Sequence, residues 1–176
     1  MLAAQSGGGL GAAADYIGKD ATAAWAATRF KDGQAKWSYE LAGNAASATL
    51  QVLDGSGKVV WQGEAPHKTT GVHDFVWDGR TATGGDAQED QVYTLKVVAR
   101  NAAGDSLDAQ VLTRGRVTGV EMYDGEIFLT VGASVLPMSS LIALEEARTA
   151  SAPSNEDDPG LLASVASALN PSKLFS

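Results

Sequence analysis

Residues 92–100, Val-Tyr-Thr-Leu-Lys-Val-Val-Ala-Arg, alternate apolar and polar side chains along most of their length. One face carries Tyr93, Leu95, Val97 and Ala99, and the other carries Thr94, Lys96, Val98 and Arg100. Successive side chains of a β-strand point to opposite faces, so this alternation predicts a strand with one buried face. Asn101–Asp105, which contains Gly104, is typical of a hairpin connection and predicts a return strand over residues 106–113.

The same alternation recurs on the N-terminal side of this strand. It is found over residues 36–41 and 47–54, and residues 71–77 repeat it with His73, Phe75 and Trp77 on one face. Asp54-Gly55-Ser56-Gly57, followed by Val59-Val60-Trp61, predicts a tight hairpin. Short strands at a spacing of about ten residues are typical of a β-sandwich, which we expect over residues 35–113.

A second small β module is expected on both sides of this sandwich. After Arg114-Gly115-Arg116, short stretches at 117–123, 127–131 and near Val135 are separated by glycine-containing turns. Such strands suit a small barrel, but they are too few to close one alone. A short strand over residues 16–22 could supply the missing part. Residues 15–34 and 114–145 are therefore predicted to form a split barrel, although counting strands does not select this arrangement over others.

The two ends of the chain differ in composition from the part between them. Residues 1–14 are rich in Gly and Ala, which predicts a flexible lead-in. Residues 146–160 predict a disordered linker in which Glu156-Asp157-Asp158 is either a solvated spacer or an acidic contact for a partner. Residues 161–169 carry apolar side chains near helical spacing. A helix this short is marginal alone, so docking on this chain, on a partner, and disorder all stay open.

The charge and residue types exclude several functions. The net charge is −8 and the sequence pI is about 4.6, so a nucleic acid partner is not expected. No apolar run approaches the length of a membrane span, and no membrane insertion is predicted. Cysteine is absent, which removes disulfides and thiolate chemistry. The first residues lack the basic and apolar regions of a signal peptide.

No catalytic site, metal site or cofactor is predicted. His67, His73 and the adjacent Asp74 are the residues that could be drawn as a metal site, but ordinary loop and strand positions explain them better. The Asp-Gly pairs lack the alternating acidic spacing of a calcium loop and are predicted to be turns. The chain is therefore not expected to be an enzyme. A small enzyme would need a convergent polar pocket around the two histidines.

The tryptophans could be core residues or an exposed sugar-binding surface, and each possibility predicts a different function. Trp37, Trp61 and Trp77 each fall in a predicted strand, which favours core anchors. Exposed and coplanar, they would instead form a platform for stacking on sugars. The alternative function is therefore a secreted β-sandwich binding module, for carbohydrate or for adhesion, with no catalytic activity.

Several motifs, taken in order, resemble those of flagellar hook-capping proteins, also called hook assembly scaffold proteins. Residues 71–79, Gly-Val-His-Asp-Phe-Val-Trp-Asp-Gly, resemble a strand and turn of that family. Residues 115–121, Gly-Arg-Val-Thr-Gly-Val-Glu, resemble the segment that follows its sandwich, and residues 16–19 and 54–60 resemble its barrel entry and a hairpin. The motif residues, expected to be structural, are Tyr16, Ile17, Gly18, Trp77, Asp78, Gly79, Gly115, Arg116, Val117 and Gly119.

The resemblance implies both a fold and a function. The fold would be all-β, an immunoglobulin/fibronectin type III-like sandwich inserted in a discontinuous Tudor/SH3-like small barrel. The protein would be made in the cytoplasm, leave through the flagellar type III apparatus and self-associate as a cap on the growing hook. There it would guide hook protein subunits into the filament. The family's N-terminal segment is expected to be missing, residues 146–176 lie beyond the resemblance, and no partner-binding residues are marked.

Overall fold

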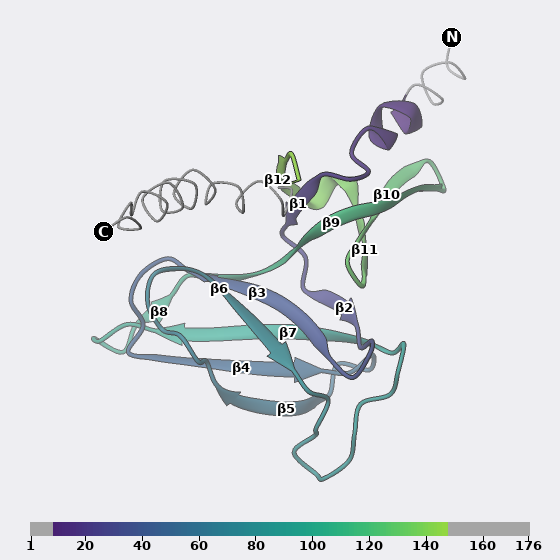
Figure 1. Ribbon diagram of the computed structural model, residues 1–176. Helices are drawn as coiled ribbons and strands as arrows, with labels where there is room; N and C mark the ends of the chain where they lie inside the picture. The colour runs from purple at the N-terminus through teal and green to yellow at the C-terminus, as the bar shows by residue number, and fades with distance from the viewer. Residues whose placement is uncertain (1–8, 148–176) are drawn as a thin grey trace, which may run out of the picture. The chain divides into compact units, whose positions relative to one another are not determined.

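The structure is a computed structural model that describes residues 9–147 (Figure 1). The predictions for the linker beyond residue 147, the acidic run at 156–158 and the apolar tail at 161–169 lie outside the described residues. Within the described part nearly all regular structure is β, and both sheets are antiparallel. The predicted all-β class with a sandwich and a small barrel is confirmed.

Strands follow one another closely along the chain. Their bounds are β1 (Asp20–Ala23), β2 (Ala27–Arg29), β3 (Ala35–Leu41), β4 (Ser47–Leu53), β5 (Val59–Glu64), β6 (Gly71–Trp77), β7 (Val92–Arg100), β8 (Ser106–Leu107), β9 (Ala109–Tyr123), β10 (Glu126–Val131), β11 (Ser134–Pro137) and β12 (Leu141–Glu145). One turn of 3₁₀-helix, η1 (Met138–Ser140), precedes β12, and residues 9–14 are helical.

The sandwich consists of two sheets facing one aromatic core. One sheet has the order β2-β7-β4-β5 with β8 beside β7, and β6, β3 and the first part of β9 form the other. The β4–β5 hairpin is present where the turn at 54–57 predicts it. Alternate side chains of these strands fill the core, whose largest fully buried members are Trp77, Tyr39, Leu41, Leu50 and Leu95. Burial of such large apolar side chains is the main stabilising contribution to this module.

A second core lies in the small barrel. Its strands have the order β11-β10-β9-β1-β12. The buried residues are small or branched and include Ala21, Ala23, Val117, Leu129, Val131 and Leu136. None of the fully buried residues of this described core is aromatic, and the partly buried rings of Tyr16 and Trp25 pack against it.

Strand β9 connects the two modules without a break. Ala109–Leu112 pairs with β3 in the sandwich, and Thr113 onward pairs with β1 and then β10 in the barrel. The sequence predicted one strand to end and another to begin at Arg114-Gly115-Arg116. Instead the strand continues, and only the strands that pair with it change. The alternation of side chains does not indicate which strands pair.

Three segments near the barrel differ from expectation. Residues 15–18 form turns and β1 begins only at Asp20, since Gly18 has a φ of 94° that belongs to a turn and not to a strand. Strand β2, placed by the sequence within the barrel part, pairs with β7 of the sandwich. Residues 9–14 form a short helix whose Ala13 is buried, where a flexible lead-in was predicted.

Candidate functional site

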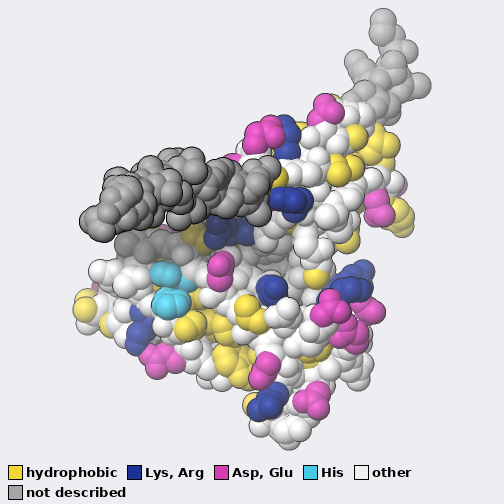
Figure 2. All heavy atoms as spheres, viewed as in Figure 1, with side chains coloured by type: hydrophobic (Ala, Val, Ile, Leu, Met, Phe, Trp, Pro, Cys, Tyr) yellow, Lys and Arg dark blue, Asp and Glu magenta, His cyan; other side chains and the backbone are white. Residues whose placement is uncertain are grey.

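The two histidines lie side by side (cyan in Figure 2), with ring centroids 5.3 Å apart. Nε2 of His73 donates to the carbonyl of Thr69 at 2.7 Å. The hydroxyl of Tyr39 donates to the carbonyl of His67 and accepts its N–H, and burial raises the pKa of this tyrosine. These contacts fasten the loop between β5 and β6 to β3. These hydrogen bonds indicate a structural role for His67 and His73.

Asp74 does not join the histidines. It lies on the opposite face of β6, where its carboxylate accepts from Ser38 Oγ at 2.6 Å and lies 3.6 Å from a guanidinium nitrogen of Arg114. Among residues 9–147, no group of three or more His, Cys, Asp and Glu side chains could hold a metal ion. The candidate site drawn from His67, His73 and Asp74 is therefore not assembled.

The Asp-Gly turns use their carboxylates within the turn. Asp54 accepts from the Ser56 hydroxyl, the Lys58 amide and the Ser56 amide, and these hydrogen bonds lower the pKa of Asp54. Asp78 accepts from the amide of Arg80 at 3.0 Å. A carboxylate that caps its own turn is stabilised by local hydrogen bonds, as expected for turn chemistry.

The tryptophans do not form an exposed platform. Trp37 and Trp77 are 3% and 2% exposed. Trp61 is half-buried and stacks on Phe75, at a centroid distance of 5.4 Å, and Trp37 stacks on the same ring at 6.2 Å. Since Trp37 and Trp77 are within the core, the sugar-stacking reading loses its main support.

The motif at residues 77–79 forms a turn built on a buried ring. The indole N–H of Trp77 donates to the carbonyl of Arg80 at 3.1 Å. Gly79 has a φ of 89°, and a Cβ there would lie 2.5 Å from the ring of Phe30. A glycine is required on both counts, because the backbone conformation disfavours a side chain and the ring fills the space.

The motif at residues 115–119 lies in β9 where this strand enters the barrel. Val117 is fully buried, while a Cβ on Gly115 would touch Val131 at 3.4 Å and one on Gly119 would touch Thr130 at 3.3 Å. Arg116 lies 3.6 Å from the carboxylate of Asp20 across the β1–β9 pair. A side chain at either glycine would therefore meet a side chain of β10 at tight contact distance.

The Tyr16-Ile17-Gly18 motif meets this strand directly. The amide of Gly18 donates to the carbonyl of Val117 at 2.8 Å, and the amide of Val117 donates to the carbonyl of Lys19 at 2.9 Å. Tyr16 packs against the barrel core, whereas Ile17 is exposed. Two motifs that lie about a hundred residues apart are therefore hydrogen-bonded neighbours.

A pocket of about 330 Å³ lies where the sandwich and barrel meet. Its lining residues are Thr28, Arg29, Lys31, Asp32, Gln34, Lys36, Thr113, Arg114, Val131, Gly132, Ala133 and Ser134. Main-chain and hydroxyl contacts hold its walls together. Arg29 N donates to Ala133 O at 3.2 Å, and Ser134 Oγ donates to the carbonyl of Ala27 at 3.1 Å.

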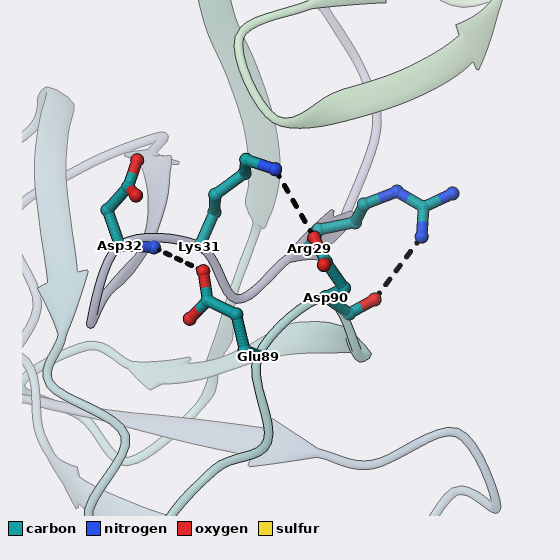
Figure 3. A network of polar contacts seen from close by, with 5 residues as sticks. All are labelled: Arg29, Lys31, Asp32, Glu89 and Asp90. Atoms are coloured by element: carbon teal, nitrogen blue, oxygen red, sulfur yellow. Dashed lines mark hydrogen bonds and ion pairs between the residues drawn. The ribbon is translucent and has the colours of Figure 1, made fainter.

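Polar contacts fix one rim of this pocket (Figure 3). Lys31 Nζ lies 3.3 Å from a carboxylate oxygen of Asp90, and a guanidinium nitrogen of Arg29 donates to the Asp90 carbonyl at 3.2 Å. Glu89 accepts from the amide of Asp32 at 2.7 Å. The β2–β3 turn is thereby tied to the segment that enters β7. Sequence reasoning did not find the pocket, because its basic side chains come from separate segments and form no run.

Comparison with known proteins finds a family match for the sandwich. Residues 25–103 match the family model described as the FlgD Ig-like domain. Over this segment the chain is similar to FlgD Ig-like domains. The match begins before β2, so the matched segment includes the strand that the sequence had placed in the barrel. The resemblance to hook-capping proteins seen in the sequence is confirmed.

Solved FlgD structures share the fold beyond this domain. The crystal structure of FlgD from Xanthomonas campestris superposes with a TM-score of 0.60 at 20% identity, covering 77% of this chain and 99% of that one. FlgD from P. aeruginosa gives 0.56 at 20% identity, covering 73% and 97%. The shared fold therefore spans the barrel as well as the sandwich. No curated protein sequence matches the chain.

In residues 9–147 there is no helix of the length and apolarity needed to cross a membrane.

Proposed function

We propose that this chain is a cap and assembly scaffold for the bacterial flagellar hook. It associates with copies of itself at the growing tip, binds hook protein and guides the polymerisation of hook subunits without turning over a substrate. It reaches the tip from the cytoplasm through the flagellar type III apparatus.

The observation that carries this proposal is the match of residues 25–103 to the family model of the FlgD Ig-like domain. It is supported by the shared fold with FlgD of Xanthomonas campestris, whose structure is described as giving insights into the hook capping essential for flagellar assembly. That likeness covers nearly the whole of the Xanthomonas chain.

The motif residues contribute to this function through the fold. Trp77, Asp78 and Gly79 form a turn on the sandwich core, and in β9 Val117, which lies between Gly115 and Gly119, is buried in the barrel core. A continuous strand joins the modules in place of a flexible linker. A scaffold that positions incoming subunits needs this kind of stiffness.

Deleting the coding sequence of this chain in its own bacterium tests the proposal. We expect cells without hooks, with hook protein released into the medium as unpolymerised subunits, and recovery of hooks when the intact chain is supplied. Electron microscopy of isolated basal bodies and blotting of the medium for hook protein measure both results. Hooks of normal length in the deletion strain would refute the capping role.

A further inference from the structure

The pocket between the sandwich and the barrel is basic in a protein that is acidic overall. The basic side chains that line it are Arg29, Lys31, Lys36 and Arg114. Among the described lining residues Asp32 is the one carboxylate, and the chain carries a net charge of −8. Concentrating positive charge in one concave site against such a background favours an anionic occupant.

The basic groups are not all neutralised by neighbours. Asp90 holds Arg29 and Lys31 in place, and Asp74 lies 3.6 Å from Arg114. The side chain of Lys36 makes no hydrogen bond or ion pair with any described residue. Its ammonium group is therefore free for a ligand of the pocket, which Arg29 and Lys31 also line. Contacts with Asp90 hold those two side chains at the rim (Figure 3).

Hydrogen bonds hold the walls of the pocket in position before any ligand binds. Thr113 Oγ1 donates to the carbonyl of Trp25 at 2.9 Å, close to where Arg114 leaves the sandwich sheet. The opposite wall is the β10–β11 turn, held to β2 by Ser134 and Ala133. A site whose groups are fixed before binding loses little entropy when it is occupied.

We propose that this pocket is a docking site for an acidic segment of a partner protein, with the segment's carboxylates taken up by Lys36, Arg114 and the Arg29–Lys31 rim. A volume of about 330 Å³ admits one or two acidic side chains. Guanidinium groups bind carboxylates through paired N–H donors, and lysine adds a mobile point charge. A nucleic acid is disfavoured because the whole molecule repels a phosphate backbone.

Binding of a fluorescein-labelled hexaglutamate peptide to the full chain, measured by fluorescence anisotropy at low salt, tests this site. We expect saturable binding that weakens as salt rises, because exposed charge pairs are screened. Replacing Lys36 by Gln should weaken binding about threefold to fivefold, as for the loss of one exposed ion pair. Amide shift changes on titration should be confined to residues 28–36, 113–114 and 131–134.

Lys96→Gln is the matched control. Lys96 is also an exposed lysine in a sandwich strand, with no described ion-pair partner, but it lies on β7, in the other sheet, and does not line the pocket. Its replacement changes the net charge equally and should leave binding unchanged. The proposal is overturned if hexaglutamate fails to bind or if both variants weaken binding equally. It is also overturned if inorganic phosphate or a single-stranded oligonucleotide displaces the peptide at lower concentration than unlabelled hexaglutamate does.

Discussion

The ring of Phe30 lies directly against the backbone of Gly79, so that a Cβ on this glycine would be 2.5 Å from the ring. Phe30 also makes edge contacts with Trp77 and Tyr93, at centroid distances of 5.9 and 6.3 Å. The turn at residues 77–79 therefore packs on a side chain that comes from the residue directly after β2. This contact joins the Trp-Asp-Gly turn to the β2 segment within the sandwich core.

Replacing Gly79 by Ala should lower the free energy of unfolding by about 2–4 kcal/mol. The new methyl group meets the Phe30 ring, and the positive φ adds its own penalty. Urea denaturation measures the loss. Gly84→Ala is the control, because Gly84 has a φ of 91° with open space around it, and it should cost only about 1–2 kcal/mol. Equal losses in the two variants would mean that the ring contact contributes nothing.

Trp77→Ala should destabilise the sandwich by about 3–5 kcal/mol, since it removes a buried aromatic side chain and leaves a cavity. Thermal unfolding followed by circular dichroism measures the change. The neighbouring Val76 is 52% exposed, and Val76→Ala should stay within about 0.5 kcal/mol of the unchanged protein. A near-neutral effect at Trp77 would contradict its placement in the core.

Removing residues 147–176 should leave both β modules folded. Every residue of the two cores lies between Tyr16 and Leu144, so the shortened chain keeps all of the described core packing. Backbone amide spectra of the two proteins should superimpose for residues 20–140. Loss of cooperative unfolding on this deletion would show that the removed residues belong to a core.

The contribution of the Asp54 turn to the free energy of unfolding should depend on pH in the acid range. Hydrogen bonds from Ser56 and Lys58 hold the folded pKa of Asp54 below its ordinary value of 3.8. Because the folded pKa is depressed, this contribution is fully present above the ordinary value. It is lost as the pH falls through the folded pKa.

Carbon-detected NMR titration of the Asp54 carboxyl measures this shift directly. Ser56→Ala removes the hydroxyl donor, which is the largest cause, and should move the pKa of Asp54 back toward its ordinary value. A carboxyl that already titrates at 3.8 in the unchanged protein would show that the turn hydrogen bonds do not form in solution.

Local sequence patterns were enough to predict those strands and turns whose structure depends on their own residues. The alternation in β7 and the Asp-Gly-Ser-Gly turn between β4 and β5 predicted those strands and their hairpin. The burial of Trp37 and Trp77 followed from the same alternation. By contrast the pairing of β2 with β7 joins residues about 65 apart, and three residues of strand carry too little pattern to name a partner.

The sequence by itself determined the all-β class, the sandwich strands and the motifs that mark a hook-capping fold, because alternation and turn chemistry are properties of neighbouring residues. Only the tertiary structure decided that β9 runs unbroken through both modules and that Gly18 bonds to Val117. It also decided that Arg29, Lys36 and Arg114 line one pocket. These contacts form when the burial of two separate cores brings distant segments together. The spacing of neighbouring residues does not predict them.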